Sequence, residues 1–272
     1  MLNRNPYAQQ QQPRDRFSSL WSGEADLENA TTSCLTRVFL RMFMALCVTA
    51  AVSAGLYYAP SPEAGYNSMT EFLLVNMDNP GMSLFILITL IVAQLGLVIF
   101  LSARVMKMSS SISNVMFFVY AILTGLSLST IFMSFDLGII FQAFLVSALM
   151  FGATAVYGAI TKRDLSRLGS ILIMALIGLI IASFVNVLFV RNDTMLMLIN
   201  YAGVLIFVGL TAYKTQNVKN MLNMVNSGAA DSIIVADRAE AIKRVSVMGA
   251  LSLYLTFINL FLRILVIMSR RR

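Results

Sequence analysis

Long apolar runs alternate with short polar segments along this chain, and the length of those runs determines its fold class. Seven runs of about 19–24 residues can each cross a hydrocarbon core ~30 Å thick, because a helix rises 1.5 Å per residue. We expect helices rather than strands, since lipid does not tolerate unpaired backbone groups and no run alternates like a barrel strand. The predicted spans are Val38–Ala59, Met82–Ala103, Val115–Met133, Gly138–Ile160, Ile171–Val190, Thr194–Tyr213 and Val245–Met268.

The N-terminal segment, residues 1–36, is polar and lacks apolar periodicity. It contains the run Gln9–Gln12 between Pro6 and Pro13, a composition typical of disordered segments. We therefore predict a disordered cytoplasmic tail at 1–36. Residues 37–272 are predicted to form an all-α integral membrane bundle of seven transmembrane helices.

Composition and charge agree with this prediction. The chain has 272 residues, of which 58% are hydrophobic and only 12% are charged, whereas a soluble domain is about 45–50% apolar and ~25% charged. The net charge of +7 comes from basic residues that mostly lie in short loops beside the spans. Such residues act as topology signals, so we expect no nucleic-acid partner.

Lys and Arg gather in every second loop, which places the N-terminus in the cytoplasm. The loop Pro60–Gly81 has no basic residue, whereas Thr161–Ser170 has three. Seven crossings place Arg270 and the two arginines after it on the outer side, against the rule. A re-entrant last segment is the alternative, but six earlier spans set a strong orientation, so we expect seven crossings.

The residue inventory excludes several kinds of catalytic site. The chain has no histidine, so it holds no Ser-His nucleophile, histidine-ligated zinc or imidazole relay. Aspartyl intramembrane proteases need two aspartates inside spans, and none lies inside the predicted spans. Cys34 and Cys47 imply no disulfide framework. We expect no enzyme, no cofactor and no metal site.

Polar residues inside the spans have two alternative interpretations. The last span carries a polar stripe on one helical face, formed by Ser252, Thr256, Asn259 and Arg263. Either this stripe joins helices by hydrogen bonds or it lines a polar pathway. Arg263 and Lys214 can also extend toward head groups. The candidates for a polar pathway are Gln94, Asn200, Ser252, Asn259 and Arg263.

Several short motifs occur in one order along about residues 38–268, and together they resemble the Bax inhibitor-1 family. The motifs are Gln94–Val98, Thr124–Ser127, Thr161–Ser166, Leu210–Tyr213 with Thr215–Gln216, and Leu251–Leu255 with Phe257–Leu262. The resemblance implies seven helices with the last helix central, and a pH-sensitive calcium leak. It also implies a latch of two aspartates in the sixth and seventh spans, which a basic residue matching Arg104 can engage.

The sequence departs from the family pattern at the latch itself. Lys214 and Thr256 stand where the pattern has the two aspartates, and Gln94 stands where it often has glutamate. Two close carboxylates share protons, and they also supply oxygen ligands for Ca²⁺. Neither the lysine nor the threonine side chain can perform both of these functions.

These departures lead to a functional hypothesis and an alternative. We expect a modified ion-leak protein or a non-conducting homologue in a bacterial inner membrane, where the lipid bilayer and either calcium ions or protons are its partners. The alternative is an interaction protein that regulates other membrane proteins, such as a quality-control protease.

Overall fold

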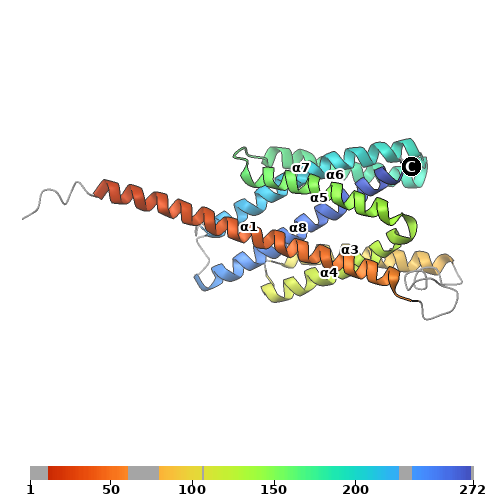
Figure 1. The fold of residues 1–272 in the computed structure, drawn as a ribbon, viewed down its shortest axis with the longest axis horizontal. Helices are drawn as coiled ribbons and strands as arrows, with labels where there is room; N and C mark the ends of the chain where they lie inside the picture. Colours follow the sequence, from red (N-terminus) through yellow and green to blue (C-terminus); the bar gives the residue numbers. More distant parts are fainter. Residues whose placement is uncertain (1–11, 61–79, 106, 227–234, 271–272) are drawn as a thin grey trace, which may run out of the picture.

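The computed structural model describes residues 12–60, 80–105, 107–226 and 235–270, and every regular element in them is a helix (Figure 1). The elements are α1 (Gln12–Tyr58), α3 (Pro80–Arg104), α4 (Ser110–Ser134), α5 (Leu137–Ile160), α6 (Ser166–Val185), the π-helical turn η2 (Asn186–Val190), α7 (Asp193–Asn226) and α8 (Val235–Ser269).

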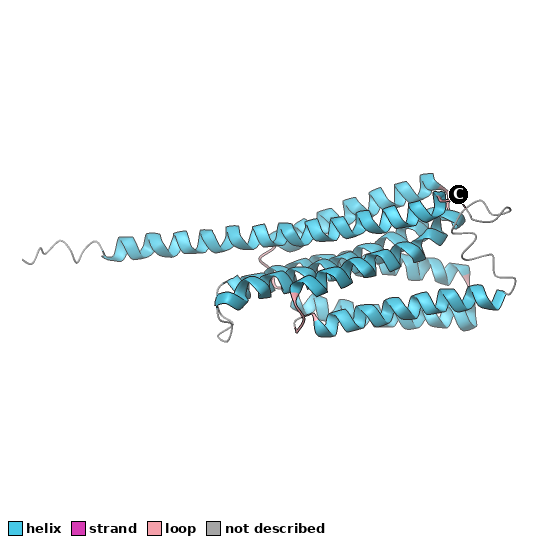
Figure 2. Ribbon diagram, turned by 90° about the horizontal axis from the view of Figure 1, so that it is seen from below, coloured by secondary structure: helices cyan, strands magenta, loops and turns pink. Residues whose placement is uncertain are grey.

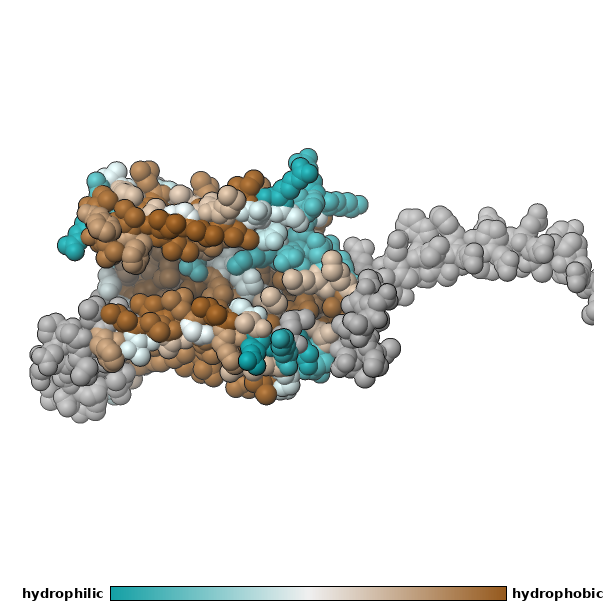
Figure 3. All heavy atoms as spheres, turned by 180° about the vertical axis from the view of Figure 1, so that it is seen from behind, coloured by the Kyte–Doolittle hydropathy of each residue, from teal (hydrophilic) through white to brown (hydrophobic). Residues whose placement is uncertain are grey.

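The seven predicted spans coincide with seven helices, which confirms the all-α class and the helix count. Within the described residues, six helices are long and apolar enough to cross a membrane, and the seventh, α3, has 25 residues and includes the apolar stretch Ile88–Arg104. Hydrophobic side chains cover the middle of the body in Figure 3, and hydrophilic ones gather toward its two ends, more densely at the right of the view. An apolar belt between more polar ends is the arrangement that a bilayer requires.

The helices form two groups, which also contact each other directly through α1 and α7 (Figure 1). In one group α1 and α3 pack on α4, and in the other α5 and α6 pack on α7. Helix α8 packs against α1, α4, α5 and α7. In the most apolar stretch of α8, 56% of the residues are buried, whereas the share for the span that contains α6 is 11%. Helix α8 therefore mostly faces protein, and α6 mostly faces lipid.

Helix α1 begins far ahead of the predicted first span. Pro13 lies in its first turn, where proline is tolerated, and the next proline is Pro60, just beyond the end of the helix. No proline between them interrupts the helix, and α1 therefore includes residues 12–36, where the sequence predicted a disordered tail. Residues 1–11 of that predicted tail lie outside the described part. The 47 residues of α1 correspond to about 70 Å, and Figure 2 shows α1 projecting beyond the other helices.

Tight turns join the antiparallel helices and satisfy their terminal backbone groups. Before α5, the Asp136 carboxylate accepts a hydrogen bond from the Gly138 N–H at 2.8 Å. Between α6 and α7, Arg191 has a left-handed backbone (φ 46°), and the buried Asn186 side chain accepts from the Asn192 N–H at 3.1 Å. These polar groups therefore have partners at the turn, as a membrane setting requires.

The end of α8 lies beside the start of α7. Arg270 Nη2 lies 2.8 Å from Asp193 Oδ1, so α8 runs antiparallel to α7 along its apolar length. A re-entrant segment would return its end toward the loop that joins α7 to α8. The geometry therefore supports a complete seventh crossing.

Candidate functional site

The two positions that replace the aspartate latch meet between α7 and α8. Lys214 Nζ donates to Thr256 Oγ1 at 2.9 Å and to the Ser252 carbonyl at 3.4 Å. Thr256 is buried and donates its own proton to the same carbonyl at 2.8 Å. Its hydroxyl therefore keeps a lone pair for the ammonium, and the three groups form one small network.

This network contains a cation and no carboxylate. Among the described residues, ion pairs join Arg244 to Glu240 and Arg270 to Asp193, and neither pair includes Lys214. Within the same part of the chain, no cluster of three or more His, Cys, Asp or Glu side chains could hold a metal ion. The arrangement joins two helices but offers a cation only neutral oxygens beside an ammonium.

A second polar contact joins the same two helices farther along. Arg263 Nη1 donates to Asn200 Oδ1 at 3.1 Å, and Asn200 Nδ2 donates to the Leu196 carbonyl at 2.8 Å. Arg263 reaches Asn200 across Gly203, where the Cβ of a larger residue would lie only 3.2 Å from Arg263 Cδ. Arg263 therefore turns inward to a protein partner, not outward to a head group.

The other two residues of the α8 stripe contribute less. Asn259 Nδ2 donates to the Leu255 carbonyl of its own helix at 2.8 Å. Ser252 takes part through its backbone carbonyl. The stripe thus contacts α7 mainly through Thr256 and Arg263, which favours helix–helix joining for these two residues.

Gln94 and Arg104 lie apart from the α7–α8 contact. Gln94 Nε2 donates to the Leu123 carbonyl at 2.8 Å and to the Ser127 hydroxyl, so it joins α3 to α4. Arg104 is the exposed last residue of α3, and its guanidinium lies 6.0 Å from the centre of the Phe100 ring. The contacts described for Arg104 include neither Lys214 nor Thr256, so the structure does not bring the three latch-equivalent positions together.

Two motifs that appeared separate in the sequence meet one helical turn from Lys214. Gln216 Oε1 accepts from the Leu165 N–H at 2.9 Å, and its Nε2 donates to the Arg163 carbonyl at 2.7 Å. Lys219 Nζ donates to the Ala159 carbonyl at 2.8 Å, at the end of α5. Sequence reasoning missed this tether, although Gln216 and the Thr161–Ser166 segment were both among the motif residues.

Close helix contact continues on the other side of α7. A Cβ on Gly158 would lie 2.3 Å from the Ala212 carbonyl oxygen, which only glycine allows. Helix α7 is therefore held by α5 on one side and α8 on the other at the level of Lys214.

Comparison with known proteins points to the same family as the sequence motifs. A family model described as inhibitor of apoptosis-promoting Bax1 matches residues 31–272. Inner membrane protein YbhL of Escherichia coli strain K12 is 40% identical over 238 residues, which cover 88% of this chain and 92% of that protein. An uncharacterized protein of Borreliella burgdorferi is 42% identical over 183 residues, 67% of this chain and 74% of that protein. This chain therefore belongs to the Bax inhibitor-1 family.

Proposed function

We propose that this protein is a modified Bax inhibitor-1-type membrane protein that does not support acid-inhibited calcium leak. The observation that carries the proposal is the Lys214–Thr256 hydrogen bond of 2.9 Å at the place of the aspartate latch. The site joins α7 to α8 without a carboxylate, so protons have no latch to open or close there. The proposed role involves no catalysis.

The charge of Lys214 also opposes a calcium ion at this place. Two unit charges 4 Å apart interact by about 4 kcal/mol at an effective dielectric constant of 20, so a divalent cation at that distance is repelled by about 8 kcal/mol. The oxygens of Thr256 and Ser252 are neutral, whereas Ca²⁺ sites usually include carboxylates.

The proposal includes the placement of the protein. A relative is named as an inner membrane protein of Escherichia coli, and we place this protein in the same membrane with its N-terminus in the cytoplasm. We also propose that α8 is the central helix. Its packing on four other helices and its 56% burial support this.

Calcium flux in proteoliposomes tests the proposal. The unaltered protein should give the same flux as empty liposomes at about pH 6 and about pH 8, the range over which a coupled carboxylate pair can change its charge. Lys214→Asp combined with Thr256→Asp should create a leak that acid inhibits. Lys214→Ala combined with Thr256→Ala is the matched control, because it removes the ammonium without adding carboxylates. A pH-dependent calcium flux through the unaltered protein contradicts the proposal.

The length of α1 favours a second candidate function, in which the protein binds other membrane proteins. Helix α1 begins at Gln12, far ahead of the first predicted span at Val38, and it projects beyond the other helices (Figure 2). A projecting helix offers a binding surface without disturbing the bundle.

Deleting residues 1–29 tests this second candidate. Co-purifying membrane proteins should be lost while the truncated protein remains monodisperse in size-exclusion chromatography. A Gly-Ser segment of the same length is the matched control and should also lose the partners. Retention of the same partners by the truncated protein contradicts a role for α1.

A further inference from the structure

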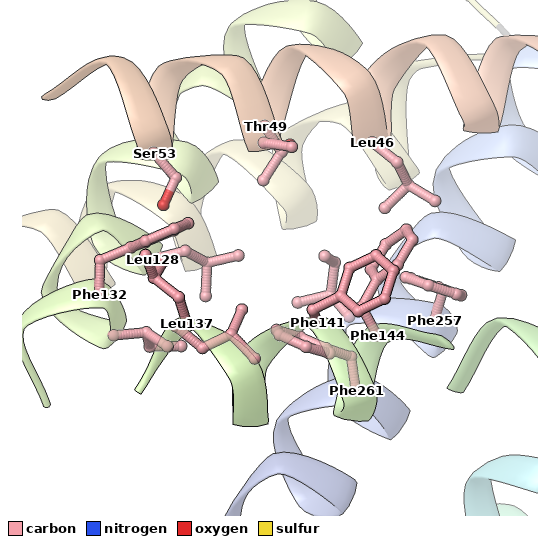
Figure 4. A pocket seen from close by; sticks show the side chains of 14 residues that line it. Leu46, Thr49, Ser53, Leu128, Phe132, Leu137, Phe141, Phe144, Phe257 and Phe261 are labelled. Carbon is pink, nitrogen blue, oxygen red and sulfur yellow. The ribbon is translucent and has the colours of Figure 1, made fainter. Parts of the chain in front are cut away.

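A cavity of about 390 Å³ lies between α1, α4, α5 and α8, away from the Lys214 network (Figure 4). Its wall is almost wholly hydrocarbon, with Leu46 of α1, Phe144 of α5 and Phe257 of α8 among the lining residues. This volume lies in the range of about 300–1,000 Å³ that small-molecule sites occupy. The cavity is therefore large enough for part of a ligand.

Ser53 is an exception among the hydroxyl groups of the spans. Other buried serine and threonine hydroxyls of the spans donate to a carbonyl of their own helix, for example Ser147 to Ala143 at 2.6 Å and Thr211 to Phe207 at 2.8 Å. Ser53 is only 2% exposed, and its Oγ has no hydrogen-bond partner in the described structure. Figure 4 shows this oxygen directed into the cavity. A buried hydroxyl without a partner is costly, so this atom points to a missing acceptor.

Water does not fit that role. A buried water needs two to four polar partners, and Thr49 is the other lining residue with a side-chain polar atom. The Thr49 hydroxyl already contacts the Ala45 carbonyl, the Ala121 carbonyl and the Tyr254 hydroxyl, at 2.9, 3.0 and 2.6 Å. Ser53 would be the single free partner, so the occupant has to be an apolar molecule with one acceptor oxygen.

The cavity opens toward lipid. Phe141 and Leu137 line it and are also 68% and 44% exposed on the surface of the bundle. Both belong to α5, one of the membrane-crossing helices. A molecule in the hydrocarbon phase can therefore enter from the side, without passing through water.

The depth of Ser53 matches the level of lipid ester groups. Tyr58 closes α1, and Tyr57 packs on Phe132 with ring centres 5.6 Å apart, an aromatic cluster typical of the membrane interface. Ser53 lies four and five residues before these tyrosines, about 6–7.5 Å deeper along the helix. Leu46, at the far part of the cavity, lies about 10 Å deeper again.

We propose that this cavity binds one acyl chain of a membrane glycerophospholipid, with the Ser53 hydroxyl donating to its ester carbonyl oxygen. The hydrocarbon wall accepts the chain, the open side on α5 admits it, and the depth of Ser53 places the ester beside the hydroxyl. The ligand would touch α1 and α8 together, which makes it a bound lipid and not part of the annular layer.

Photo-crosslinking of the full-length protein tests this site. The protein is placed in vesicles of phosphatidylethanolamine and phosphatidylglycerol that contain a phosphatidylglycerol with a diazirine within one acyl chain, and adducts are mapped by mass spectrometry. We expect adducts on cavity residues of α1 and α5. Ser53→Ala should lower their yield about two- to tenfold at limiting probe, the effect of one lost hydrogen bond.

A filling variant and its control separate binding from general lipid contact. Ala50 lines the cavity and is exposed at its edge, so Ala50→Trp should suppress cavity adducts without forcing the core apart. Ala51 is exposed on the same helix but does not line the cavity, and Ala51→Trp should leave the yield unchanged. Thermal unfolding of each variant shows whether it is folded.

Three results would overturn the proposal. One is adducts spread evenly over all lipid-facing residues, and another is equal yields from the Ala50 and Ala51 variants. The third is labelling of the cavity by a diazirine fatty acid that an excess of phospholipid does not reduce, because that would assign the cavity to a free amphiphile.

Discussion

The Lys214–Thr256 contact predicts a measurable coupling energy between α7 and α8. Thr256→Val keeps the shape of the side chain but removes the acceptor, and Thr256 is only 1% exposed, so water does not replace it. The ammonium then keeps the Ser252 carbonyl at 3.4 Å. We expect Thr256→Val to lower the free energy of unfolding by about 1–2 kcal/mol.

The partner substitution gives the second arm of a double-mutant cycle. Lys214→Met removes the ammonium and leaves an apolar chain of similar length, so we expect little loss of stability, or a gain. Once Lys214 is methionine, Thr256→Val should cost less by about 0.6–1.7 kcal/mol, the range found for hydrogen bonds between transmembrane helices. That difference is the coupling energy of the contact.

The assay is reversible unfolding in bicelles, with all four proteins measured under the same conditions. Ser147→Ala is the control, because Ser147 is buried on α5 and bonds only within its own helix in the described contacts. It should show no coupling to Lys214→Met. A Lys214–Thr256 cycle that is additive within about 0.3 kcal/mol would refute the reasoning.

Three further substitutions test other parts of the bundle. Gly158→Ala places a methyl group against the Ala212 carbonyl oxygen, 2.3 Å from an unstrained Cβ, and should lower stability by about 1–3 kcal/mol in the same assay; an unchanged value would contradict close packing. Gln216→Ala removes the tether of the loop 161–165, so trypsin should cleave that loop faster than in the unaltered protein. Arg270→Ala breaks an exposed ion pair and should change stability by less than about 1 kcal/mol; a larger loss would assign that pair a structural role.

The membrane spans could be predicted because bilayer thickness fixes the length of an apolar helix. The predicted span Gly138–Ile160, for example, differs from α5 (Leu137–Ile160) by one residue. The extension of α1 could not, since residues 12–29 carry no apolar periodicity, and the absence of proline between Pro13 and Pro60 permits a helix there without specifying one. Apolar periodicity arises where one face of a helix packs on a partner. It therefore does not identify a helical segment that projects beyond the bundle.

The site was predictable only along α7 and α8. Those two helices run antiparallel side by side, so Lys214 and Thr256 follow from the motif register. Arg104 depends on where α3 docks, and α3 packs on α4, a choice that no local pattern encodes. Gln216 was a motif residue, but its partners lie more than fifty positions earlier, and only tertiary structure reveals the pair.

Helix α8 contacts helices of both groups, α1 and α4 of one and α5 and α7 of the other. Thr256 and Phe257 are consecutive residues on it, about 100° apart around the helix. The first bonds to Lys214 of α7, and the second forms part of the cavity wall, to which α1, α4 and α5 also contribute. A turn of α8 about its own axis would move both residues, so such a rotation would change the polar contact and the shape of the cavity together. A ligand in the cavity that favoured one rotational setting of α8 would therefore also change the stability of the Lys214–Thr256 contact, and by linkage that contact would change the affinity for the ligand by the same factor.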